Sequence, residues 1–134
     1  MTGQRRDLNR EKFKSENLSA VLNNPESNAN KNLKYLSNAM DIRSELKQFH
    51  PGSQMKCLSK GRSDLVVIKR GNGPESVFAI HNMTDNKINY QLNDNDLPKI
   101  IDNDFNTFDF LASTKYNCKN ISLDPFQVIW LSSL

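Results

Sequence analysis

The sequence predicts an α+β protein in which N-terminal helices precede a small antiparallel all-β domain of sandwich-like form. Apolar residues recur at helical spacing through the first fifty residues. After His50-Pro51-Gly52 the pattern changes to short runs rich in Val, Ile and Phe, separated by Gly, Pro, Asn and Asp. A chain of 134 residues has room for one small domain with a helical appendage. We therefore expect a helical segment over 1–50 and a β domain over 51–134.

Two helices are expected in the first segment. A short helix begins near Ser15, and Asn23-Asn24-Pro25 ends it because proline removes a backbone donor. A second helix runs from about Ser27 to Phe49. Its apolar residues recur in steps that place them on one stripe: Leu33, Leu36, Ala39, Met40, Leu46 and Phe49. One helix cannot bury this stripe, so the segment Leu33–Phe49 is expected to pack on a partner surface or to self-associate.

Seven strands are expected in the second segment, connected by polar turns. Gly71-Asn72-Gly73-Pro74 is typical of a hairpin turn, because glycine adopts positive φ without steric cost. The expected strands are Gln54–Leu58, Leu65–Arg70, Ser76–Asn82, Lys87–Asn93, Thr107–Leu111, Ile121–Leu123 and Gln127–Leu131. The expected core consists of Val66, Ile68, Val77, Phe78, Ile80, Val128 and Trp130.

Composition narrows the class of protein. The net charge is +3, without the dense basic stripe and interleaved aromatic residues of a nucleic-acid-binding protein. No apolar run approaches the roughly 20 residues that span a bilayer, and the polar N-terminal residues lack the apolar region of a secretory signal. Cys57 and Cys118 lack metal-ligand spacing and are expected to be reduced. These features predict a cytoplasmic protein with no nucleic-acid or membrane partner.

The sequence gives little indication of a metal or cofactor site. Residues Asp102–Asn106 alternate oxygen ligands like the start of a calcium loop, but Thr107 replaces the glycine and Ser113 replaces the closing glutamate. A solvated acidic loop is therefore expected there. His50 and His81 have no Cys or His at ligand spacing and are expected to be structural. No metal and no cofactor are predicted.

Four segments resemble sucrose phosphorylases and their glucosylglycerate- and glucosylglycerol-phosphorylase relatives, which belong to glycoside hydrolase family 13 of the alpha-amylase superfamily. Residues 2–10 resemble the family's TGxGRDINR segment, with matches at Thr2, Gly3, Arg6, Asp7, Asn9 and Arg10. The other three segments are Ile42-Arg43 with Phe49-His50-Pro51, Phe78–Thr84, which resembles LHNVT, and Leu123–Leu131, which resembles LxPYQVxWL. Arg5, Leu8 and Glu11 depart from the sucrose phosphorylase pattern and favour a relative acting on another glucoside.

The resemblance implies that residues 1–50 are the last loop and helix of a TIM-type barrel and that residues 51–134 are the family's C-terminal β domain. Family members transfer an α-glucosyl group with retention, using an Asp nucleophile and a Glu acid/base on earlier barrel strands. This chain lacks both residues. The resemblance therefore implies a C-terminal fragment that supports the barrel structurally and is inactive alone. Two origins stay open: a remnant of a truncated gene, and one part of an enzyme reconstituted with a separately encoded catalytic barrel. In either case an α-glucoside and phosphate would bind only in the complete enzyme.

The resemblance assigns no catalytic residue and at most two substrate-binding residues to this chain. Arg10, with Arg6 as the second candidate, would pair in the complete enzyme with an Asp that also holds the glucose. A guanidinium suits this role because its planar fork donates two hydrogen bonds to a carboxylate. The alternative is that both arginines are exposed without partners. The alternative function is a stand-alone carbohydrate-binding or interaction β module, with candidate aromatic residues Tyr90, Phe105, Phe108 and Tyr116.

Overall fold

The structure is a computed structural model that describes residues 14–97 and 106–132. It divides into two compact units, Met1–Met40 and Asp41–Leu134, and the division falls inside the second helix. The helices followed by antiparallel strands confirm the predicted fold class. The predicted domain boundary at residue 50 stays a prediction.

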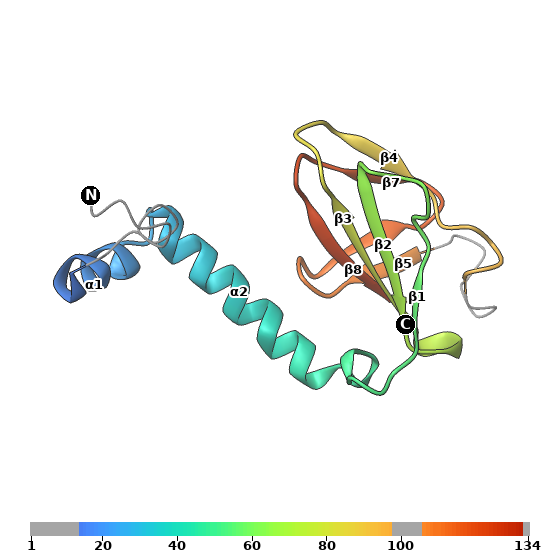
Figure 1. Cartoon of the computed structure of the whole chain (residues 1–134), viewed down its shortest axis with the longest axis horizontal. Helices are drawn as coiled ribbons and strands as arrows, with labels where there is room; N and C mark the ends of the chain where they lie inside the picture. Colours follow the sequence, from blue (N-terminus) through green and yellow to red (C-terminus); the bar gives the residue numbers. More distant parts are fainter. Residues whose placement is uncertain (1–13, 98–105, 133–134) are drawn as a thin grey trace, which may run out of the picture. The chain divides into compact units, whose positions relative to one another are not determined.

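The first unit contains helix α1, Ser15–Asn23, and most of helix α2, Asn28–Glu45 (Figure 1). The turn between them is fixed by side-chain hydrogen bonds. The Ser27 hydroxyl accepts from the backbone N–H of Asn30 at 3.1 Å and donates to the carbonyl of Asn24 at 2.9 Å. The Asn30 amide donates to the carbonyl of Leu22. Ser27 thus satisfies a backbone donor that the first turn of α2 would leave unpaired.

The second helix ends earlier than the sequence pattern predicts. α2 stops at Glu45, and a separate 3-10 turn, η1, covers Lys47–Phe49. Leu46 between them has extended backbone dihedrals, φ −86° and ψ 105°. The apolar stripe is therefore interrupted at Leu46, and Phe49 belongs to a turn that contacts the β domain.

The second unit is a two-layer arrangement of antiparallel strands. One sheet has six strands in the order β1-β2-β3-β8-β5-β6, and the other pairs β4 with β7 (Figure 1). The strands are β1 Met55–Cys57, β2 Leu65–Arg70, β3 Val77–Asn82, β4 Ile88–Tyr90, β5 Asn106–Asp109, β6 Thr114–Asn117, β7 Ile121–Leu123 and β8 Val128–Ser132. The sequence pattern did not predict β6, because Thr-Lys-Tyr-Asn offers no apolar alternation.

The hairpin predicted at residues 71–74 is confirmed and joins β2 to β3. Gly71 and Gly73 have φ of 76° and 67°, in the left-handed region that favours glycine, and a short 3-10 turn, η2, spans Gly73–Glu75. A Cβ on Gly71 would lie 3.0 Å from the Cγ of Gln48. Gly71 therefore serves both the turn and the close approach of the η1 segment.

The core lies between the two sheets. The inner face of the six-stranded sheet contributes one set of alternating residues, and the segments around β4 and β7 cover it. The buried cluster comprises Leu65, Val67, Phe78, Ile80, Leu92, Cys118, Ile121, Leu123, Ile129 and Leu131, all with 0% exposure.

Four predicted core residues lie on the other face of the sheet. Val66, Ile68, Val128 and Trp130 are only partly buried, whereas their neighbours in sequence form the core. The prediction was wrong because β2 and β8 are apolar on both faces, and a continuous apolar run does not reveal which set of alternating residues points inward. Val77, Phe78 and Ile80 were predicted correctly.

Asp109 joins the end of β5 to β8. Its side chain is fully buried, and one carboxylate oxygen accepts backbone N–H groups of Trp130 at 2.8 Å and Leu111 at 3.1 Å. The other oxygen has no hydrogen-bond partner among the described residues. Burial raises the pKa of Asp109 above its usual value, while the backbone hydrogen bonds act in the opposite direction.

Candidate functional site

The outer face of the six-stranded sheet is the most distinctive surface of the β domain. Antiparallel register places Val66, His81 and Val128 in one row across three strands, and Ile68, Ala79 and Trp130 in the next. A sheet face in contact with water usually carries polar residues at these positions. We define these six residues as the outer face. Five of the six are apolar, with His81 the exception, and this composition indicates a face that packs against other protein surface.

The η1 segment covers part of the outer face. The ring of Phe49 lies 4.6 Å from that of Trp130, with an angle of 44° between the ring planes. Arg70 holds the segment by donating to the carbonyls of Gln48 at 3.2 Å and His50 at 2.8 Å. The aromatic contact and the two hydrogen bonds fix the end of the helical region on the β domain. Trp130 is thus a packing residue on the outer face.

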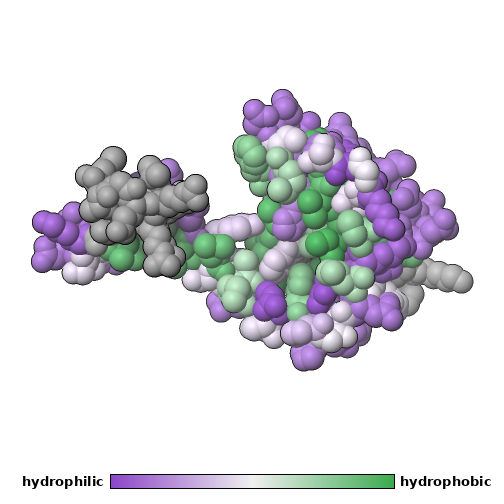
Figure 2. Space-filling model, viewed as in Figure 1, coloured by the Kyte–Doolittle hydropathy of each residue, from purple (hydrophilic) through white to green (hydrophobic). Residues whose placement is uncertain are grey.

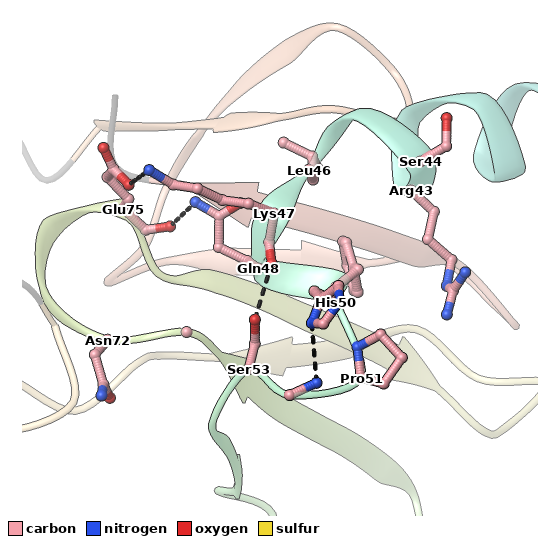
Figure 3. A pocket seen from close by; sticks show the side chains of 13 residues that line it. Arg43, Ser44, Leu46, Lys47, Gln48, His50, Pro51, Ser53, Asn72 and Glu75 are labelled. Carbon is pink, nitrogen blue, oxygen red and sulfur yellow. Dashed lines mark hydrogen bonds and ion pairs between the residues drawn. The ribbon is translucent and has the colours of Figure 1, made fainter.

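A cleft of about 860 Å³ lies beside this contact, between the η1 segment and the β2–β3 hairpin (Figure 3). The Lys47 ammonium and the Glu75 carboxylate form an ion pair of 2.5 Å at its wall. His50 accepts a hydrogen bond from the backbone N–H of Gly52 through Nδ1, at 3.1 Å. The structural role expected for His50 is confirmed. The lining residues are Arg43, Ser44, Leu46, Lys47, Gln48, Phe49, His50, Pro51, Gly52, Ser53, Gly71, Asn72 and Glu75.

The cleft does not have the chemistry of a glycoside-cleaving site. Retaining cleavage needs two carboxylates about 5–5.5 Å apart. Of the described residues that line the cleft, Glu75 alone carries a carboxylate, and Lys47 pairs with it. The hydrogen bonds drawn in Figure 3 instead join the η1 segment to neighbouring parts of the β domain. In one of them Gln48 Nε2 donates to the carbonyl of Glu75 at 2.7 Å. We interpret the cleft as a by-product of this packing.

The remaining reactive side chains of the β domain are dispersed. Burial lowers the pKa of His81 on the outer face, which favours the neutral imidazole. Cys57 is exposed, and its hydrogen bond to Ser59 lowers the pKa of the thiol, whereas Cys118 is buried. Within residues 14–97 and 106–132, no three His, Cys, Asp or Glu side chains gather as a metal site requires.

The length and hydropathy of the helices bear on whether the chain could cross a membrane. None of the helices in the described part of the chain combines the length and apolar character needed to cross a bilayer.

The structure does not bring the predicted sugar-binding aromatic residues together. Tyr90 and Tyr116 belong to different sheets and pack, half-buried, against the core. The Tyr116 hydroxyl accepts a hydrogen bond from Gln127 at 3.0 Å. Phe108 contacts Phe110, with ring centroids 5.8 Å apart. Phe105 lies outside the described residues.

The two predicted substrate-binding residues, Arg10 and Arg6, also lie outside the described residues, as does the acidic segment 102–105. The outer face was missed as a site. Its signal in the sequence was the run Leu65-Val66-Val67-Ile68, which is apolar at every position and therefore indicates a strand buried on both sides.

The arrangement of helix, short turn and two-layer antiparallel β domain has counterparts among solved structures, although no family model and no curated protein sequence matches the chain. AmyP in complex with maltose matches with a TM-score of 0.61 and 16% sequence identity, over 78% of this chain and 21% of AmyP. The trehalose-6-phosphate hydrolase of Bacillus licheniformis matches with a TM-score of 0.54 and 19% identity, over 84% of this chain and 19% of the hydrolase. A mutant of that hydrolase matches with a TM-score of 0.54.

The chain therefore shares the fold of one region of these solved proteins. It spans about a fifth of the length of the solved chains that it matches.

Proposed function

We propose that this chain is the C-terminal portion of an α-glucosyl-transferring phosphorylase related to sucrose phosphorylase, and that it supports a catalytic barrel without being active alone. One observation carries the proposal: most of this chain matches only about a fifth of the enzymes whose fold it shares. The four sequence motifs support the finer assignment to glucoside phosphorylases. The protein is then expected to act in the cytoplasm on an α-glucoside and phosphate, with the barrel supplied by a separately encoded chain.

The outer face supports this role. Val66, Val128 and Trp130 are apolar and partly exposed although they lie on the middle strands of a sheet. Burial of apolar surface contributes roughly 25 cal/mol per Å², so covering such a face is favourable. A barrel packed against this face would bury it, and the contact of Phe49 with Trp130 would position the end of the barrel helix.

The proposal is tested by glucosyl transfer in two preparations. The purified chain alone is expected to show no turnover of sucrose, glucosylglycerate or glucosylglycerol with phosphate. Co-expression with a barrel encoded by the adjacent upstream reading frame is expected to restore phosphate-dependent turnover. Turnover by the chain alone, retained through repurification, would contradict the proposal, and so would an upstream frame whose barrel is fully active without this chain.

Arg10 provides the sharpest variant in the reconstituted enzyme. If Arg10 pairs with a buried carboxylate at the glucose subsite, its removal leaves that charge unpaired, at a cost of roughly 3–5 kcal/mol. We expect Arg10→Ala to lower kcat/KM strongly and Arg10→Lys not to restore it, because an ammonium lacks the two-pronged geometry. Arg5→Ala is the matched control and is expected to be nearly silent. A large effect of Arg6→Ala with a harmless Arg10→Ala would move the assignment to Arg6.

The alternative of a stand-alone carbohydrate-binding module has less support, because the described candidates Tyr90, Phe108 and Tyr116 are spread over three strands. Titration calorimetry of the chain with maltose and with soluble α-glucan distinguishes the barrel-support role from the carbohydrate-binding module. Binding by the chain alone that is lost in Tyr90→Ala or Phe108→Ala would favour the module.

A further inference from the structure

A short segment after β4 connects two distant parts of the β domain. Residues 92–97, which we define as the strap, form a turn in which the N–H groups of Asp96 and Leu97 donate to the carbonyl of Asn93, at 3.0 and 3.2 Å. The chain leaving β4 runs along the right-hand side of the β domain in Figure 1, and hydrophilic residues cover most of that side in the space-filling view (Figure 2). The strap belongs to no strand, so contacts of its side chains and carbonyls decide how firmly it is held.

The first end of the strap packs beside the buried Cys118. The N–H of Leu92 donates to the carbonyl of Cys118 at 2.9 Å, and both side chains belong to the core cluster with 0% exposure. Lys119 holds this end from the turn between β6 and β7. Its ammonium donates to the carbonyl of Leu92 at 3.4 Å and forms an ion pair with Asp94. Leu92 therefore contributes to the packing that keeps the Cys118 thiol from solvent.

The second end of the strap is held by two lysines on neighbouring strands. Lys56 on β1 and Lys69 on β2 are partners in the antiparallel register, so their side chains lie on one face, where like charges repel. Asp96 binds both of them. Its carboxylate pairs with Lys56 at 2.6 Å, and its backbone carbonyl accepts from Lys69 at 2.6 Å. Moving Asp96 away would leave two facing cations without this acceptor.

We propose that the strap is an electrostatic latch, which opens while the sheets stay folded and thereby gives access to the Cys118 thiol. Opening breaks ion pairs whose lysines reach solvent and removes Leu92 and Leu97 from the edge of the core, but it breaks no strand pairing. A segment held in this way opens locally more often than the whole domain unfolds. Salt favours the open form, because mobile ions screen the pairs of Lys56 and Lys119. This latch goes beyond the proposed support of a barrel and does not depend on it.

Thiol labelling of the full chain tests the latch. The sequence has two cysteines, so Cys57→Ser leaves Cys118 as the sole thiol. We expect the neutral reagent 4,4′-dithiodipyridine to label Cys118 at least about tenfold faster than the globally unfolded population, measured by urea denaturation, allows. Low urea concentrations should change this rate little, because opening the strap exposes little surface. Raising NaCl from about 0.1 M to about 1 M shortens the screening length from roughly 10 Å to roughly 3 Å and should accelerate labelling severalfold.

Matched variants in the Cys57→Ser background locate the latch. Asp96→Asn keeps the shape of the side chain, removes its charge, and is expected to accelerate labelling about fivefold or more and to weaken the salt response. Asp94→Asn should act in the same direction with a smaller effect, because the Asp94 side chain is 80% exposed. Asp124→Asn is the control. It removes the same charge from the Lys87–Asp124 pair of 3.2 Å, outside the strap, and should leave labelling unchanged.

Each labelling rate is compared with the free energy of unfolding of the same variant, so a general loss of stability does not imitate opening. Three results would overturn the proposal. One is labelling of Cys118 that follows global unfolding at every urea concentration. Another is equal acceleration by Asp96→Asn and Asp124→Asn, and the third is a salt response that Asp96→Asn leaves intact. These readouts involve no glucosyl transfer, so the outcome is independent of the activity of a reconstituted enzyme.

Discussion

Asp109 and His81 give the β domain two pH responses of opposite sign. Burial raises the folded-state pKa of Asp109 above the ordinary value of 3.8, so the stability linked to this group is present below that value and is lost as pH rises through the folded pKa. Burial lowers the folded-state pKa of His81 below 6.5, so its contribution is present above that value and is lost as pH falls. Between the two ordinary values, 3.8 and 6.5, the two contributions change in opposite directions with pH.

Replacing Asp109 by Asn should expose the histidine response alone. The Asn carbonyl can still accept the N–H groups of Trp130 and Leu111, while the charge that burial disfavours is gone. We expect urea unfolding of Asp109→Asn to show a steeper loss of stability than the parent as pH falls from 6.5 toward 3.8. His81→Gln is the counterpart and should show a gain over the same range. Identical pH profiles for the parent and both variants would contradict this assignment.

At the scale of the element, the alternation within β2 decides which side chains stabilise the fold. Val67 has 0% exposure and faces the core, whereas Val66 lies partly exposed on the outer face. Val67→Ala should lower the free energy of unfolding by roughly 2–3 kcal/mol, from about 0.8 per deleted carbon plus the cavity left behind. Val66→Ala deletes the same atoms and should cost less than about 1.5 kcal/mol. Equal losses by urea denaturation would show that the outer face is as fully packed as the core.

The start of α2 depends on one hydroxyl. Because Ser27 Oγ accepts the N–H of Asn30, Ser27→Ala should reduce helix stability by about 1 kcal/mol. Ser44→Ala is the matched control, since that hydroxyl bonds the carbonyl of Asp41 near the helix end. Helical signal at low temperature should fall in the first variant and not in the second.

The elements were more predictable from the sequence than their orientation. β2 and β7 have the predicted bounds because turn residues flank compact apolar runs. The inward set of residues in β2 and β8 was not predictable, because both sets are apolar and only the tertiary arrangement distinguishes them. The contact between Phe49 and Trp130 was also beyond the sequence, since it joins residues from distant segments.

At the scale of the whole molecule, protection from hydrogen exchange should follow the sheet. β3 lies between β2 and β8, and five of its six residues are buried. We expect its amides to exchange slowest, at the rate of global unfolding. The amides of α1 and α2 should exchange fastest at low protein concentration, because their apolar residues are exposed. Slow exchange across α2 in dilute solution would mean that other parts of the chain cover it.

β8 has a second consequence through its place between β3 and β5. Within the six-stranded sheet, β8 alone joins the β1-β2-β3 group to the β5-β6 hairpin. It is therefore a central strand that holds the two halves of the sheet together. A premature stop codon before Val128 would divide the sheet and leave β3 and β5 with unpaired edges, which are templates for aggregation. Tolerance to shortening should therefore disappear abruptly at this strand. Fusion tags or engineered extensions belong after β8, because the hydrogen bonds of β8 to β3 and β5 are then complete.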